Sequence, residues 1–227
     1  MKYQEVISGT FISRPNRFIA NVEIDGAIHT VHVKNTGRCK EILTPGAKVY
    51  LSVAQNPERR TKYDLIAVEK QTQGGTFLIN MDSQIVNDVA AEYLRARYPQ
   101  GTVKREVTFE NSRFDFYVEC ENMRAFVEAK GVTLENGGVV AFPDAPTERG
   151  VKHLKELIYA KSQGYDAFVL FIIQMKDVKY FTPNDQTHKE FGDTLREAKE
   201  KGVGILALSC QVTPDTIITD KEVEVRL

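Results

Sequence analysis

The sequence predicts an α/β protein of two domains, with a small β-barrel or sandwich over residues 1–80 and an α/β domain over residues 81–227. Three observations predict this organisation. Apolar and polar residues alternate in the first third of the chain. The apolar spacing then changes to the helical period beyond residue 80. From there, helical and strand-like segments alternate around one continuous apolar run.

Four short strands are expected in the first domain. Apolar residues alternate over 18–24, the Asp25-Gly26 pair predicts a hairpin turn, and a second strand covers 27–33. Further alternation predicts strands at 47–54 and 62–69. Several short strands without a helix are typical of a small barrel or sandwich.

The second domain opens with a helix. Gln73-Gly74-Gly75 is the loosest segment before the helical spacing, so we place the domain boundary near residue 80. An apolar stripe from Ile85 to Leu94 predicts the helix, with Asp82 or Ser83 as its N-cap and Pro99 beyond its end.

The remaining elements alternate between strands and helices. Helix 148–163 is expected to begin at the cap Thr147 and to end at Gly164, and the apolar run 166–173 is expected to be a central strand. The other segments are strands at 104–110, 113–119, 124–130 and 203–208, with a turn at Glu121-Asn122, and a helix at 188–201.

Charge is unevenly distributed, although the net charge is only −1. Residues 1–80 hold 11 Lys or Arg against 7 Asp or Glu, and the rest holds 19 against 24. Any DNA affinity must therefore come from a local basic surface, which we expect on the first domain. Three Cys residues in no C-x-x-C pair predict neither disulfides nor a zinc site and favour a cytoplasmic location. The longest apolar run is too short to cross a bilayer, so no membrane role is expected.

Asp115, Glu128 and Lys130 form the pattern that predicts chemistry. Side chains two apart on a strand point the same way, so Glu128 and Lys130 share a face, and Asp115 lies on the preceding strand of the expected hairpin. Two carboxylates suit Mg²⁺ or Mn²⁺, and a nearby lysine can orient a water or offset charge. The pattern predicts a catalytic site for phosphodiester hydrolysis, with Asp115 and Glu128 as metal ligands.

A simpler interpretation stays open, in which the three residues form a salt-bridge cluster on an exposed sheet face. Glu197-Ala198-Lys199 repeats the triplet in an expected helix, where positions two apart do not face each other. Only the Glu128 copy follows an acidic strand and precedes a helix and a buried strand.

Arg149, His153 and Glu156 have the spacing of one helix face that begins at the positive N-terminus. Arg149 and His153, with Asp144 in the preceding loop, are candidates for contacting a phosphate or supporting the metal site. The alternative is a solvated face with an ordinary Lys152–Glu156 pair.

A basic surface on the first domain is the expected DNA-binding site. Lys34, Arg38 and Lys40 surround the turn at Asn35-Thr36-Gly37, and Arg14, Arg17, Arg59, Arg60 and Lys62 could join them on the barrel surface. The candidate contact residues are Arg14, Arg17, His32, Lys34, Asn35, Arg38 and Lys40. Small barrels often hold nucleic acid on such a surface. Two alternatives remain: the Asn-Thr-Gly sequence makes only a turn, and the charges are simply solvated. The chain has no Trp for base stacking.

Taken together, four motifs resemble the sugar fermentation stimulation protein A family over essentially the whole chain. They are His32-x-x-Asn35-Thr36-Gly37, Ser112-Arg113-x-Asp115-Phe116, Glu128-x-Lys130 and Phe142-Pro143-Asp144-Ala145-x-Thr147-x-Arg149-Gly150-x-x-His153-Leu154. The resemblance implies DNA binding, an N-terminal barrel similar to the OB-fold, and a C-terminal α/β domain with a mixed central sheet, similar to PD-(D/E)xK nucleases.

The resemblance also implies roles for particular residues. Asp115 and Glu128 match the metal carboxylates of the nuclease pattern, and Lys130 matches its lysine. No proline precedes Asp115, and the acidic residue that many such nucleases carry on the first helix has only Asp88 or Glu92 as candidates.

Three functional hypotheses follow. The first is a Mg²⁺- or Mn²⁺-dependent nuclease that acts on DNA. The second is a non-catalytic DNA-binding regulator of sugar (maltose) metabolism genes on the same fold. The third is a barrel-containing module that binds another ligand.

Overall fold

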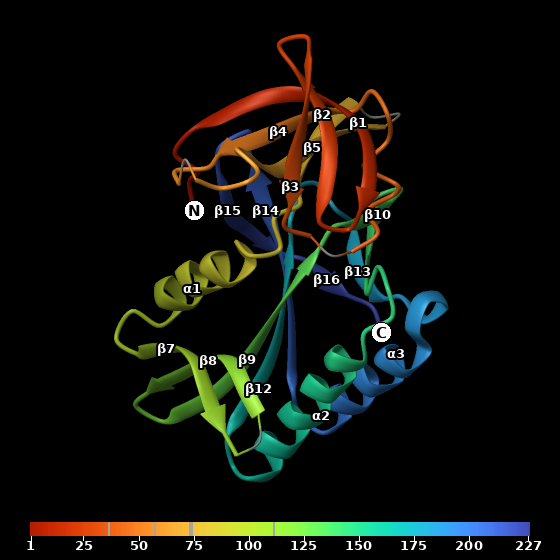
Figure 1. The fold of residues 1–227 in the computed structure, drawn as a ribbon. Helices are drawn as coiled ribbons and strands as arrows, with labels where there is room; N and C mark the ends of the chain where they lie inside the picture. Colours follow the sequence, from red (N-terminus) through yellow and green to blue (C-terminus); the bar gives the residue numbers. More distant parts are fainter. Residues whose placement is uncertain (36, 57, 73–74, 111) are drawn as a thin grey trace.

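Two large sheets dominate the structure, a computed structural model that describes residues 1–35, 37–56, 58–72, 75–110 and 112–227. One sheet closes into a barrel at one end of the molecule, and helices flank the other, as Figure 1 shows. The predicted α/β class with two domains is confirmed, as are the barrel and the mixed central sheet.

The barrel sheet has the strand order β3-β2-β1-β4-β5-β6, and an additional β3–β5 pairing closes it. Its strands are β1 (Val6–Asn16), β2 (Ile19–Ile24), β3 (Ala27–Val33), β4 (Lys48–Val53), β5 (Tyr63–Thr72) and β6 (Gly75–Asn80). The predicted Asp25-Gly26 hairpin turn is confirmed, since both residues have positive φ, 51° and 80°. Strands β1 and β6 were not predicted. Thr36 of the turn motif, and Gln73 and Gly74 of the loose segment, lie outside the described residues.

The central sheet of the second half has the order β15-β14-β12-β9-β8-β7. Its strands are β7 (Thr102–Phe109), β8 (Ser112–Cys120), β9 (Met123–Val132), β12 (Asp166–Ile173), β14 (Gly204–Val212) and β15 (Ile217–Glu222). Strands β9, β12 and β14 pair in parallel, and the outer pairings are antiparallel. The predicted central strand is β12, and its bounds match.

Helices cover both faces of this sheet (Figure 1). The three helices of the described chain are α1 (Val86–Arg97), α2 (Glu148–Ser162) and α3 (Asp185–Glu200). Apolar residues of α1 pack on one face, whereas those of α2 and α3 join a core on the other that continues into the barrel. Among described residues, no helix combines the length and apolar character that a membrane crossing requires.

The helix starts test the predicted caps. Thr147 caps α2 as predicted, because its side chain accepts a hydrogen bond from Gly150 N at 3.0 Å. The prediction of Asp82 or Ser83 for α1 is wrong, since that helix begins after Ile85 without a side-chain cap. Helix α3 begins with an extra turn at 185–187, which the Asn184 side chain caps, and its backbone kinks at His188, the predicted first residue.

A third sheet of four short strands was not predicted. Its strands, in the order β10-β11-β13-β16, are β10 (Leu134–Asn136), β11 (Val139–Phe142), β13 (Tyr180–Pro183) and β16 (Glu224–Val225). Strand β11 leads into the loop before α2, and Gly37 of the barrel lies against Asp144 of that loop.

Candidate active site

The structure brings Asp115, Glu128 and Lys130 together on β8 and β9. The pairing of these antiparallel strands ends at Phe116 and Val127, the residues next to Asp115 and Glu128. The backbone N–H of β9 residue 129 donates to Asp115 Oδ2 at 2.9 Å, and Lys130 Nζ donates to Glu128 Oε1 at 2.5 Å. The two carboxylates and the amine therefore form one cluster.

Helix α2 adds His153 and Arg149 to this cluster. His153 Nδ1 contacts Glu128 Oε1 and lies 3.3 Å from Lys130 Nζ. Arg149 Nε donates to His153 Nε2 at 3.2 Å, so Nδ1 carries the ring proton that points toward Glu128. Glu128 is only 2% exposed, so the cluster is not a surface salt bridge on an open sheet face.

The two carboxyl groups differ in their electrostatics. Burial raises the pKa of Asp115, and the nearby Glu128 carboxylate raises it further against the opposing effect of Lys130. Burial also disfavours the charged form of Glu128, but the His153 hydrogen bond and the Lys130 charge hold its pKa below the usual range. Glu128 is thus kept as an anion, whereas burial and the neighbouring Glu128 carboxylate disfavour the charged form of Asp115, which a bound cation would favour.

Asn87, in the first turn of α1, is a site residue that the sequence pattern missed. Its side-chain Nδ2 donates to Asp115 Oδ1 at 2.9 Å. The acidic candidates on that helix lie elsewhere: Asp88 pairs with Arg105 at 2.5 Å, and Glu92 pairs with the N-terminal amine at 2.7 Å. The helix therefore contributes an amide and not a carboxylate, and only its position in the first turn could have indicated it.

A second group of potential ligands, Glu148, His188 and Glu190, has atoms that all lie within 4.8 Å of one another. Thr147 N donates to His188 Nδ1 at 3.3 Å, which leaves the ring proton on Nε2. That nitrogen lies 3.4 Å from Glu148 Oε1, so the Nε2 proton of the neutral ring faces this carboxylate. A cation at Nε2 would have to displace this proton, so the Asp115–Glu128 pair is the better metal candidate.

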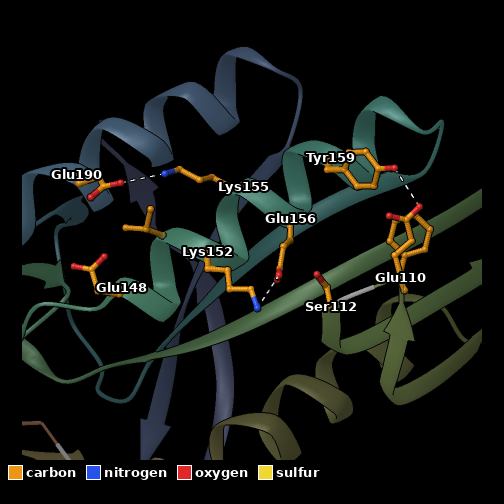
Figure 2. Close-up of a pocket in the computed structure, with 10 residues that line it drawn as sticks. Glu110, Ser112, Glu148, Lys152, Lys155, Glu156, Tyr159 and Glu190 are labelled. Atoms are coloured by element: carbon orange, nitrogen blue, oxygen red, sulfur yellow. Dashed lines mark hydrogen bonds and ion pairs between the residues drawn. The ribbon is translucent and has the colours of Figure 1, made fainter.

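Figure 2 shows a groove along α2 that contains Glu148 and Glu190 but not the active-site cluster. Both lysines of the groove are paired with carboxylates, Lys155 with Glu190 at 3.1 Å and Lys152 with Glu156 at 3.5 Å, as the sequence predicted for the second pair (Figure 2). Glu110 and Glu148 add further negative charge. The groove therefore offers little excess positive charge for a phosphate. Glu156 lines it, whereas His153 on the same helix reaches Glu128.

Some residues of the predicted basic surface are exposed to solvent, and the others form hydrogen bonds or ion pairs within the protein. Arg17, Arg38 and Lys40 are exposed and line an open groove of about 440 Å³. Arg14 lies beneath, and its guanidinium donates to the carbonyl oxygens of residues 17, 35, 37 and 38 at 2.6 to 2.9 Å. Asn35 is buried, and its side chain accepts a hydrogen bond from Gly37 N at 2.8 Å. Arg14 and Asn35 thus stabilise the turn, whereas Arg17, Arg38 and Lys40 are the residues exposed to solvent around it.

His32 and Lys34 are held by a buried carboxylate of the barrel. Asp64 accepts from His32 Nδ1 at 3.0 Å and pairs with Lys34 Nζ at 3.2 Å and with Arg59 at 2.7 Å. Lys34 also reaches Asp82, next to α1, at 3.3 Å. These two members of the predicted surface therefore stabilise the barrel and its junction with the second half.

Asp144 lies between the barrel turn and the active-site strand. A Cβ at Gly37 would collide with the Asp144 carboxylate. Both residues line a cavity of about 200 Å³ that also includes Gly131, the neighbour of Lys130 on β9. Asp144 is therefore near the site without a contact to Glu128 or Asp115 among the described hydrogen bonds.

Comparison with known proteins agrees with this architecture. The family model "SfsA N-terminal OB domain" matches residues 12–79, and "Sugar fermentation stimulation protein RE domain" matches residues 84–216. The chain is 58% identical to the sugar fermentation stimulation protein homolog of Desulfitobacterium hafniense over 229 residues, 100% of this chain and 99% of that protein. The homolog from Clostridium beijerinckii is 56% identical over 220 residues, 96% of each.

A solved structure of Pyrococcus furiosus SfsA in complex with Ca²⁺ has a TM-score of 0.88 to this fold. It is 29% identical in sequence, and the match covers 100% of this chain and 98% of that one. The chain therefore belongs to the sugar fermentation stimulation protein family.

Proposed function

We propose that this protein binds DNA and hydrolyses phosphodiester bonds at Asp115, Glu128 and Lys130 with a divalent cation, Mg²⁺ or Mn²⁺. One observation carries the proposal: two carboxylates and an amine from adjacent strands meet in a largely buried cluster. Such a cluster is the arrangement expected of a PD-(D/E)xK-type site on a mixed sheet. We also propose that residues 1–80 bind DNA and that residues 81–227 carry the site.

The donor atoms fit a hard cation. Asp115 and Glu128 supply carboxylate oxygens, which Mg²⁺ and Mn²⁺ prefer. Glu128 Oε2 accepts no hydrogen bond from the described residues, so it is the oxygen open to a ligand. The complex of the Pyrococcus furiosus relative with Ca²⁺, another oxygen-bound cation, supports the same class of ion here. When bound, the cation would stabilise charge on the phosphate and lower the pKa of a bound water.

The chain's own residues would orient the reactants. Lys130 Nζ is next to the Glu128 carboxylate and is suited to orient a water or to offset charge on the phosphate. Arg149 fixes the ring of His153, and His153 in turn fixes Glu128. We infer that Arg149 and His153 are positioning residues, because they act through Glu128.

DNA binding is supported by the exposed Arg17, Arg38 and Lys40 around one groove on the OB domain. Basic side chains of this kind neutralise phosphates and release counterions. The cytoplasm is the proposed compartment, supported by three cysteines that are free thiols.

One observation favours the second hypothesis, a non-catalytic DNA-binding regulator of sugar metabolism genes. Glu128 Oε1 already accepts a hydrogen bond from Lys130 and contacts His153, so the cluster satisfies part of its charge without a cation. In that case the fold would hold DNA, and the triad would stabilise the sheet.

A cleavage assay separates the two hypotheses. Plasmid DNA is incubated with Mg²⁺ or Mn²⁺ and the wild type, Lys130→Ala or Asp115→Ala, with Lys199→Ala as the matched control from the Glu197-Ala198-Lys199 repeat on α3. Cutting by the wild type and the control, with cutting lost but binding kept in the two site variants, supports the nuclease. Binding without cutting by the wild type in both metals supports the regulator.

Salt dependence tests DNA binding independently of cleavage. Each neutralised phosphate should add about 0.9 to the slope of log affinity against log salt concentration on duplex DNA. A flat slope would contradict DNA binding and favour the third hypothesis, a module for another ligand.

A further inference from the structure

Phe18 is an exposed aromatic ring that the packing of the barrel does not explain. It is 48% exposed, whereas Ala20 and Val22, which follow it on β2, are fully buried. The Asn16 side chain accepts hydrogen bonds from the backbone N–H of residues 18 and 19 at 2.9 and 3.2 Å, which holds the turn between β1 and β2. The ring is therefore kept outside the core by a fixed turn.

A cation covers part of this ring. The Arg17 guanidinium carbon lies 4.8 Å from the centroid of the Phe18 ring. An arginine over an aromatic ring presents two flat surfaces on which a nucleic-acid base can stack. The pair thus presents an exposed aromatic surface in a chain that has no Trp.

Arg17 belongs at the same time to the basic groove. Asn16, Arg17, Arg38 and Lys40 line it on the barrel side, and Ala145 lines it from the loop before α2. The end of β1 lies on the side of the barrel that faces the second half (Figure 1).

The groove is built from two turns that the partly buried Arg14 side chain holds together. Arg14 donates to the carbonyl oxygen of Arg17 in the β1–β2 turn and to those of Asn35, Gly37 and Arg38 in the turn after β3, all within 2.9 Å. Because both turns are tied to one guanidinium, the groove is preformed, which limits the entropy lost on binding.

The groove adjoins a cavity at the junction with the second half. Gly37 lines both the groove and this cavity of about 200 Å³, which Gly131 of β9 also lines.

We propose that this groove binds an unpaired DNA strand, with phosphates contacted by Arg17, Arg38 and Lys40 and a base stacked on Phe18, which lies beside the groove next to Arg17. The inference rests on the DNA binding proposed above and deepens it by naming single-stranded DNA as the substrate. Base faces are open to an aromatic ring only when the bases are not stacked in a duplex, so the exposed ring selects the unpaired form.

The test measures binding of the full-length protein by fluorescence anisotropy in EDTA, so that no cleavage occurs. The probes are a labelled oligothymidine, the duplex that it forms with oligoadenine, and an abasic strand of the same length. Wild type should bind the oligothymidine more tightly than the duplex or the abasic strand. Phe18→Ala and Phe18→Leu should weaken oligothymidine binding roughly 5- to 100-fold without changing the salt slope, because no phosphate contact is lost.

Two further variants complete the design. Ile28→Ala is the matched control, since Ile28 is 66% exposed on β3 of the same barrel, and it should bind as the wild type does. Arg38→Ala should lower the salt slope on the single strand by about 0.7.

The failures of the two proposals are distinguishable. If both Phe18 variants bind oligothymidine as the wild type does while Arg38→Ala still lowers the slope, the stacking proposal is overturned and DNA binding stands. Tighter wild-type binding to the duplex also overturns the proposal for an unpaired strand. Absence of binding to every probe, at low as at high salt, overturns the proposed DNA binding itself.

Discussion

Replacing Asp64 by asparagine should destabilise the barrel because three basic side chains converge on this buried carboxylate. Arg59 binds it through two nitrogens at 2.7 and 3.0 Å, Lys34 lies at 3.2 Å, and His32 at 3.0 Å. Burial disfavours the charged form of Asp64, but Arg59, Lys34 and His32 together lower its pKa to about 2. The introduced amide would remove that charge and leave the basic side chains without their shared partner.

The magnitude follows from the pKa. The shift from 3.8 to about 2 corresponds to roughly 2 kcal/mol of folding free energy, at about 1.4 kcal/mol for each pKa unit. Because the folded pKa of Asp64 is lower than the unfolded one, this stabilisation is complete above the unfolded value. It is lost progressively as the pH falls from about 4 to about 2.

Urea unfolding at pH 7 and at several values down to pH 2 measures the effect. Asp64→Asn should lower the free energy of unfolding by about 2 kcal/mol at pH 7, and the difference from wild type should shrink toward pH 2. Asp25→Asn, at the exposed hairpin turn of the same barrel, is the control and should change little. An equal loss at pH 7 and pH 2 would refute the charge explanation and assign the effect to packing.

Two other predictions concern the site and the thiols. Asn87→Ala removes an amide that donates to a carboxylate of the proposed metal site, so it should weaken Mn²⁺ binding roughly 10- to 100-fold, as measured by calorimetry. Asp88→Ala, on the same helix, should not, and equal losses would contradict the assignment. Burial raises the pKa of Cys39 and Cys210 to about 12, so in native protein Cys120 should be the fast-reacting thiol toward an Ellman-type reagent. Rapid labelling of either buried cysteine in native protein would disprove this.

Local signals predicted most of the long elements. The Asp25-Gly26 turn, the Thr147 cap and the apolar run 166–173 each depend on neighbours in sequence, and all three are confirmed. The predicted cap of α1 was wrong because of a contact with the barrel. Asp82 accepts from Gln84 N at 2.9 Å and from Lys34 of the barrel, so its side chain serves the junction and not the helix.

The short third sheet could not be predicted in the same way. Its strands have two to four residues, too few to display a period of two, and they pair with segments far away in the sequence. Val139 of β11, for example, pairs in parallel with Tyr180 of β13, on the far side of α2 and β12 in the chain.

For the site, the spacing of Glu128 and Lys130 and a hairpin partner at Asp115 were sufficient to predict which side chains meet. The hydrogen bonds of Asn87 to Asp115 and of Arg14 to the carbonyl oxygen of Asn35 were not predictable, because each joins segments that are distant in the sequence. The sequence also did not predict that Phe18 is exposed, since the alternation of apolar residues assigns it to the buried face of a strand.

Binding of Mn²⁺ followed by titration calorimetry tests the central claim most directly, because it needs no DNA and no turnover. The wild type and Glu148→Gln, a change in the second ligand group, should bind the ion alike. Asp115→Asn and Glu128→Gln should each abolish that binding. Unchanged binding in both of these variants, with loss in Glu148→Gln, would contradict a metal site on β8 and β9.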